Sequence, residues 1–135
     1  MSSLTTLARP YAKAAFELAQ GEQALARWEE MLSLAGSIVV EKSMANLLRS
    51  PEVSSALAVN IITEAAGEAF DGRFRDFLSV LAGNDRLSLL PQIMVLYRRL
   101  REEAEKRLSV KVVSAIPLDE DQASRMREAL ARRFD

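Results

Sequence analysis

Apolar residues follow a helical spacing from the N-terminus to about Arg107. Glycine, proline and capping residues divide this stretch into six predicted helices. Three are placed at about residues 4–20, 22–40 and 72–84, although Pro10 leaves the start of the first one open. The others are a short helix after Ser43, a helix from Pro51 to about residue 66, and a helix from Ser88 to about Arg107. The predicted N-caps are Ser43, Ser50, Asp71 and Ser88, and Gly67 is predicted to end the fourth helix.

The first predicted helix is apolar over an unusually wide arc. Its residues 7–20 read LARPYAKAAFELAQ. On a helical projection the apolar positions cover roughly 200°, where about 100° is usual for a surface helix. They form two adjoining stripes, one with Leu7, Tyr11, Ala14, Ala15 and Leu18 and the other with Ala8, Ala12, Phe16 and Ala19.

The fifth predicted helix has an equally wide apolar arc, formed by Phe74, Phe77, Leu78, Leu81 and Ala82, with Val80 on its flank. Two interpretations fit both helices. They either lie centrally in the bundle, with neighbours on several sides, or flank a groove that receives an amphipathic helix of a partner. Alanines favour the groove somewhat, because small side chains leave a trough for another helix. The pattern alone does not choose between the two.

Buried faces are also predicted for the other helices. The second helix places Leu25, Trp28, Leu32, Ala35 and Val39 on one stripe, and the fourth places Val53, Leu57, Ile61 and Ala65 on another. In the sixth helix the predicted face holds Leu90, Ile93, Met94, Tyr97, Leu100 and Ala104, and the charged end, RRLREEAEKR, is expected to extend into solvent.

The periodicity changes after Arg107. LSVKVVSA alternates and is rich in β-branched residues, which predicts a strand that ends at Pro117. A helix follows, with Asp119 as its cap, Gln122 completing a capping box, and a thin apolar stripe of Ala123, Met126 and Leu130. A lone strand has no partner for its backbone. Residues 108–135 are therefore predicted to be an incomplete second domain, poorly ordered unless paired with another copy.

Composition excludes several classes of function. The 135 residues are 49% hydrophobic and 27% charged, which is typical of a globular protein. With 18 basic and 19 acidic residues, the net charge of −1 gives no general attraction to nucleic acid or anionic lipid. The longest apolar run, residues 32–40, is far shorter than the roughly 20 residues of a membrane span.

The sequence shows no arrangement of residues that indicates catalysis or metal binding. The chain has no cysteine and no histidine, which removes thiol chemistry, imidazole bases and nearly all zinc sites. Carboxylates such as Glu102, Glu103 and Glu105 alternate with basic residues, as on a solvated helix face. No phosphate-binding or metalloprotease motif is present. The arginines that could meet the phosphates of a nucleic acid lack the interleaved aromatic residues of such a surface: Arg98, Arg99, Arg101, Arg132 and Arg133. We expect no catalytic residues, no metal and no cofactor.

Two motifs carry a resemblance to a known family. ARPYAKAAFELA, residues 8–19, resembles the opening of the delta subunit of bacterial F-type ATP synthase, the family of the mitochondrial oligomycin-sensitivity-conferring protein. LAGNDRLSLLPQIMVLY, residues 81–97, resembles a second family pattern, with Asp85 where a glycine or small polar residue is common. SVKVVSAIPL falls where the family begins its C-terminal domain. The resemblance covers the whole chain in register, and family members continue for some tens of residues further.

The resemblance implies an all-α, six-helix N-terminal domain, residues 1–107, followed by the incomplete β-α start of a C-terminal α+β domain, residues 108–135. It implies a non-catalytic stator component that links the catalytic head to the peripheral stalk and supports proton-driven ATP synthesis. Such a protein would lie peripherally on the cytoplasmic face of the bacterial inner membrane. Its N-terminal bundle would hold the N-terminal helix of the alpha subunit, and its C-terminal domain, largely missing here, would contact the stalk b subunits.

The resemblance places the alpha-subunit helix in a groove between the first and fifth helices, the two with wide apolar arcs. Combined with the helical projections, it predicts that the groove is lined by Ala8, Tyr11, Ala12, Ala15, Phe77, Val80, Leu81 and Asn84. Tyr11 is equally compatible with the core, and the projection does not decide which stripe of the first helix faces the partner. The alternative function is a generic helical interaction module with another partner.

Overall fold

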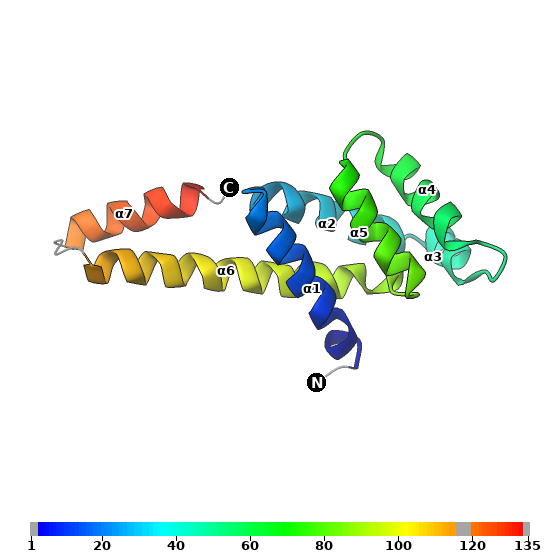
Figure 1. Cartoon of the computed structure of the whole chain (residues 1–135), viewed down its shortest axis with the longest axis horizontal. Coiled ribbons are helices and arrows are strands. Elements are labelled where there is room, and N and C mark those ends of the chain that lie inside the picture. The colour runs from blue at the N-terminus through cyan, green and yellow to red at the C-terminus, as the bar shows by residue number, and fades with distance from the viewer. Residues whose placement is uncertain (1–2, 116–119, 134–135) are drawn as a thin grey trace.

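The computed structural model describes residues 3–115 and 120–133, and these residues are almost entirely helical (Figure 1). The first four helices are α1 (Ser3–Gly21), α2 (Leu25–Val40), α3 (Lys42–Arg49) and α4 (Ser55–Ala66). They are followed by α5 (Gly72–Gly83), a short 3-10 helix η1 (Leu87–Leu89), α6 (Leu90–Ala115) and α7 (Glu120–Arg133). The first six α-helices occupy the regions in which the sequence predicts helices.

The long helix α6 is the support on which the others pack. Both α1 and α2 pack against it, with contacts to Tyr97 in its first half from Phe16 and Leu25, and α4 packs against α5 and α2. Figure 1 shows α1 crossing α6, with α5 beside it, while the second half of α6 projects away from the bundle. The core therefore lies where α1, α2 and α5 meet the first half of α6.

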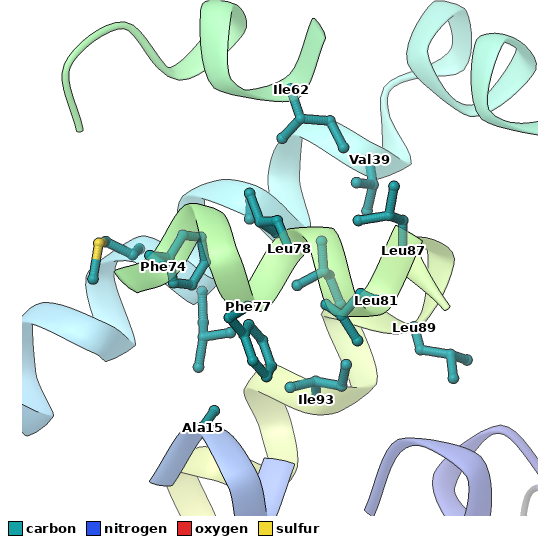
Figure 2. Close-up of a cluster of buried hydrophobic side chains, with 14 of the residues drawn as sticks. Ala15, Val39, Ile62, Phe74, Phe77, Leu78, Leu81, Leu87, Leu89 and Ile93 are labelled. Atoms are coloured by element: carbon teal, nitrogen blue, oxygen red, sulfur yellow. The ribbon is translucent and has the colours of Figure 1, made fainter. Parts of the chain in front are cut away.

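Aromatic side chains of α2 and α5 form the centre of the core. Trp28 is fully buried and packs edge-on against Phe74 and Phe77, with ring centroids 5.4 and 5.7 Å apart. Figure 2 shows Phe77, Leu81 and Ile93 pointing toward one another, with Ala15 approaching from α1. The predicted buried faces of the second and fifth helices are both confirmed, because every residue named for them is buried, except Val80 on the flank.

Two of the predicted helix ends are confirmed by their local geometry. The Asp71 carboxylate accepts a hydrogen bond from the backbone N–H of Phe74 at 2.9 Å, so Asp71 caps α5. Gly67 ends α4 with a φ of +69°, a conformation that side-chain-bearing residues rarely adopt.

Three predicted caps are wrong. Glu41, not Ser43, caps α3, because its longer side chain reaches the backbone N–H of Met44. The hydroxyl of Ser50 accepts from the N–H of Glu52 in a turn, and α4 begins later, after Ser54. Ser88 lies inside η1 rather than at the start of α6.

The later start of α4 accompanies a different buried face from the one predicted. Ala58, Val59 and Ile62 are buried, whereas Leu57 is 45% exposed. The predicted stripe was wrong because this helix, SALAVNIITEAA, is apolar on nearly every side. Its orientation is therefore set by packing against α2 and α5 rather than by its own periodicity.

The predicted strand at residues 108–115 is also wrong, because α6 continues as a helix to Ala115. A helix satisfies its backbone groups within itself, whereas a strand needs a neighbour. No strand occurs among residues 3–115 and 120–133 that could pair with it. The predicted helix that follows is confirmed as α7, which folds back along α6 with Ala123 buried (Figure 1). The predicted cap Asp119 lies outside the described residues.

Candidate partner-binding surfaces

The wide apolar arc of α1 divides into a buried part and an accessible part. Ala8, Ala12, Ala15 and Ala19 are all 0% exposed and form a buried alanine stripe. This stripe combines positions from both predicted stripes. Because alanine is small, it permits the close packing of α1 against α6 and the rest of the core. These four side chains therefore serve the fold of the chain itself.

A second row of apolar residues on α1 remains accessible. Leu4 is 46% exposed and Leu7 is 42% exposed, Ala14 is exposed, and Tyr11 and Leu18 are half-buried. Their spacing places all five on one side of the helix. We call them the outer α1 stripe: Leu4, Leu7, Tyr11, Ala14 and Leu18.

Helix α5 adds apolar surface near α1. Ala15 of α1 points toward Phe77 of α5 in Figure 2, so the two helices approach each other there. On the outside of α5, Val80 is 54% exposed. Asn84 is also exposed, and its side-chain amide donates a 3.0 Å hydrogen bond to the carbonyl oxygen of Val80. The α5 helix end thus presents both an apolar side chain and a polar one.

The eight residues predicted to line a partner groove therefore divide into two groups. Tyr11, Val80 and Asn84 are accessible, at least in part. The other five are buried within the chain's own core: Ala8, Ala12, Ala15, Phe77 and Leu81. Sequence reasoning left out Leu4 and did not assign Leu7 to a contact surface. Leu4 lies seven residues before Tyr11 and Leu7 lies four residues before it, and this spacing was the available signal, since it places them on one helix face.

Charged residues near the start of α2 and the middle of α6 have a structural role. Arg101, whose side chain is only 10% exposed, pairs with Glu29 at 3.1 Å and with Glu105 at 3.2 Å. Arg98 also pairs with Glu29, at 3.3 Å. Two of the arginines considered for phosphate binding, Arg98 and Arg101, are thus engaged in ion pairs that join α6 to α2 or reinforce α6.

A buried hydrogen bond lies beside these ion pairs. The Tyr97 hydroxyl donates to the carbonyl oxygen of Leu25 at 2.6 Å. Burial raises the pKa of Tyr97 well above its usual range, although the nearby Arg101 opposes this effect and Glu29 adds to it. The phenol therefore stays protonated and acts as a donor that fixes α6 against the start of α2.

The described part of the chain contains no cluster of three or more acidic side chains placed to hold a metal ion. None of its helices alone has the length and apolar composition to cross a membrane. Taken together, α2 and α3 have the length and apolar composition of a membrane span, but they are bent by 81° at the break between them.

The chain is similar in sequence to known ATP synthase subunits. A profile of the family described as ATP synthase delta (OSCP) subunit matches residues 7–135. ATP synthase subunit delta of Thioalkalivibrio sulfidiphilus (strain HL-EbGR7) is 41% identical over 134 residues, which are 99% of this chain and 75% of the relative. That of Marinobacter nauticus (strain ATCC 700491 / DSM 11845 / VT8) is 35% identical over 135 residues, covering 100% and 76%. The resemblance found in the two motifs is confirmed, and the chain belongs to the ATP synthase delta (OSCP) subunit family, which makes it a structural stator subunit of F-type ATP synthase.

Proposed function

We propose that this chain is a non-catalytic adaptor that fastens the catalytic head of ATP synthase to the peripheral stalk. In this role it binds the N-terminal helix of an alpha subunit with its helical bundle, and the stalk b subunits through its C-terminal part. It lies peripherally at the cytoplasmic face of the bacterial membrane and supports proton-driven ATP synthesis. Neither partner is present in the structure, and the proposal rests on the family and on one surface feature.

That feature is the outer α1 stripe. A helix on the surface of a single folded chain normally presents polar residues to water, yet this stripe leaves two leucines more than 40% exposed. An amphipathic partner helix can cover such a row with its own apolar face. The stripe and Val80 of α5 therefore form the surface that we assign to the alpha-subunit helix, in place of the buried alanines.

This role requires stable binding to the two partners and no catalysed reaction. A stator adaptor has to stay attached while torque is applied, so slow dissociation is its main physical requirement. Specific interfaces bury about 1,200–2,000 Å² in total. Ordering a free helix costs several kcal/mol, so area alone does not set the affinity.

Calorimetric titration with a peptide of the alpha subunit's N-terminal helix tests the proposal. We expect one-to-one binding with a negative heat-capacity change, because apolar surface is buried. Leu7→Glu should weaken binding at least about tenfold, or about 1.4 kcal/mol, without changing the helical content. Leu57→Glu is the matched control, since Leu57 is 45% exposed on α4, and it should bind like the parent chain.

The alternative function, a helical interaction module with another partner, predicts a different result. The chain would then release no heat with the alpha-subunit peptide at high concentration. Equal losses for Leu7→Glu and Leu57→Glu would also contradict the assigned surface, because only one of the two positions lies on it.

A further inference from the structure

A groove lies between α1 and α6, on the flank of α1 that faces away from the outer α1 stripe. It has a volume of about 510 Å³, within the usual range of binding pockets. Phe16 of α1 and Leu96 and Leu100 of α6 line it, and all three are only half-buried. The ring of Phe16 also packs edge-on against Tyr97, with centroids 6.1 Å apart. The groove thus offers a preformed apolar floor that its own chain leaves partly uncovered.

The rim of this groove has an excess of positive charge. Arg9, Lys13, Arg99 and Arg107 line it, against two carboxylates, Glu17 and Glu103, a difference of +2. The groove between α6 and α7 has two acidic and two basic side chains, so its charge is balanced. The whole chain carries a net charge of −1. The excess is therefore local to the α1–α6 groove.

Three of these basic side chains are available to a partner. Within the described part of the chain, Lys13, Arg99 and Arg107 form no ion pair, and each is exposed. The neighbouring Arg98 and Arg101 instead pair with Glu29. The fold thus pairs the arginines that face α2 with Glu29, whereas Lys13, Arg99 and Arg107 at the groove take part in no ion pair among the described residues.

The positions of the charges indicate an extended partner. Arg99 and Arg107 are eight residues apart on one helix, which corresponds to about 12 Å along its axis. Lys13 lies on the other helix, across the apolar floor. One small anion cannot contact all three, whereas a helix with several carboxylates along its sides can.

We propose that the α1–α6 groove binds an acidic amphipathic helix of another protein. Large apolar side chains of that helix pack on Phe16, Leu96 and Leu100, and its flanking carboxylates pair with Lys13, Arg99 and Arg107. The site lies beyond the buried alanine stripe from the outer α1 stripe, so it does not depend on the proposed function. A chain with both surfaces can contact two helical segments at once.

A designed pair of peptides tests this site on the full 135-residue chain. The first is an 18-residue helix with leucine at heptad a and d positions and glutamate on both flanks, and the second replaces each glutamate by lysine. We expect the acidic peptide to bind at least tenfold more tightly in calorimetry, with an affinity that falls as salt is added. Amide chemical shifts should change around Phe16, Leu96 and Leu100.

Charge reversal provides the matched variants. Lys13→Glu combined with Arg99→Glu should weaken binding of the acidic peptide at least tenfold, since both positions are exposed and the fold should persist. Lys42→Glu, at an exposed lysine on α3, should leave the affinity unchanged. Saturation with the alpha-subunit peptide should also leave it unchanged.

Four results would overturn the inference. These are equal affinity for the acidic and basic peptides, an equal loss in the Lys42→Glu control, and full competition by the alpha-subunit peptide. The fourth is sedimentation showing a dimer whose contact buries the groove, because the occupant would then be a second copy. Failure of the alpha-subunit peptide to bind would contradict only the proposed function.

Discussion

The Tyr97 hydroxyl donates a 2.6 Å hydrogen bond to the carbonyl oxygen of Leu25, across 72 positions of the chain. Tyr97 lies on α6 and Leu25 is the first residue of α2, so this bond fixes the support helix against the start of a core helix. The two helices also share the Glu29–Arg101 ion pair. Together these contacts hold the part of α6 on which α1 packs.

Removal of this hydroxyl should lower stability modestly. Tyr97→Phe keeps the ring and its packing but loses the hydrogen bond, so we expect the free energy of unfolding to fall by about 0.5–1.5 kcal/mol. Urea denaturation followed by the fluorescence of Trp28 measures this change. Tyr11→Phe is the control and should change stability little, because the Tyr11 hydroxyl has no partner among the described residues. Equal effects would contradict a structural role for the Tyr97 bond.

The same phenol predicts a loss of stability in alkali. Because burial raises the pKa of Tyr97 in the folded state, the unfolded chain releases this proton at a lower pH than the folded chain. The contribution of Tyr97 is complete below the ordinary tyrosine pKa of about 10 and declines as the pH rises beyond it. Unfolding free energies measured from pH 9 to 11 should therefore fall less in Tyr97→Phe than in the parent chain. An equal fall of the unfolding free energy in both chains would contradict a raised pKa of Tyr97 in the folded state.

Ion pairs at Glu29 should differ in strength according to their exposure. The Arg101 side chain is 10% exposed and pairs with two carboxylates, whereas that of Arg98 is 47% exposed. We expect Arg101→Ala to cost about 1–3 kcal/mol, through lost packing and charge pairing, and Arg98→Ala less than about 1 kcal/mol. Thermal or urea unfolding compares the two variants. A larger loss for Arg98→Ala would contradict this ranking.

Substitutions at two adjacent alanines of α1 should distinguish residues needed for folding from residues needed for binding. Ala15 is 0% exposed, so Ala15→Glu buries an unpaired carboxylate and should destabilise the chain by about 3 kcal/mol or more. Ala14 is exposed on the outer α1 stripe, so Ala14→Glu should fold normally but bind the alpha-subunit peptide more weakly. Circular dichroism and calorimetry distinguish the two. A folded Ala15→Glu chain would contradict the assignment of the buried stripe.

The sequence alone predicted the elements that depend on local signals. Asp71 was recognised as a cap because its carboxylate acts three residues away, and Gly67 because its backbone conformation suits glycine. The buried faces of the second and fifth helices followed from periodicity. Each of these features is determined within a few turns of its own helix.

Apart from the helix caps, where neighbouring side chains compete for the same backbone N–H groups, the features that were missed depend on distant parts of the chain. Which of the α4 apolar residues is buried depends on α2 and α5, and so Leu57 was placed wrongly. The alternation after Arg107 is typical of a strand, but a strand requires a partner and α7 instead packs along a continued helix. In α1, periodicity could not show that the alanines approach the core while the leucines stay outside.

The most direct test of the proposed function is the solvent accessibility of the outer α1 stripe in the assembled complex. The chain has no cysteine, so Leu7→Cys and, as a control, Leu57→Cys each introduce a single thiol on an exposed position. We predict that binding of the catalytic head slows alkylation of the thiol at position 7 at least tenfold and leaves that at position 57 unchanged. Unchanged alkylation at position 7 in a complex that has formed would contradict the assignment of this stripe to the alpha-subunit helix.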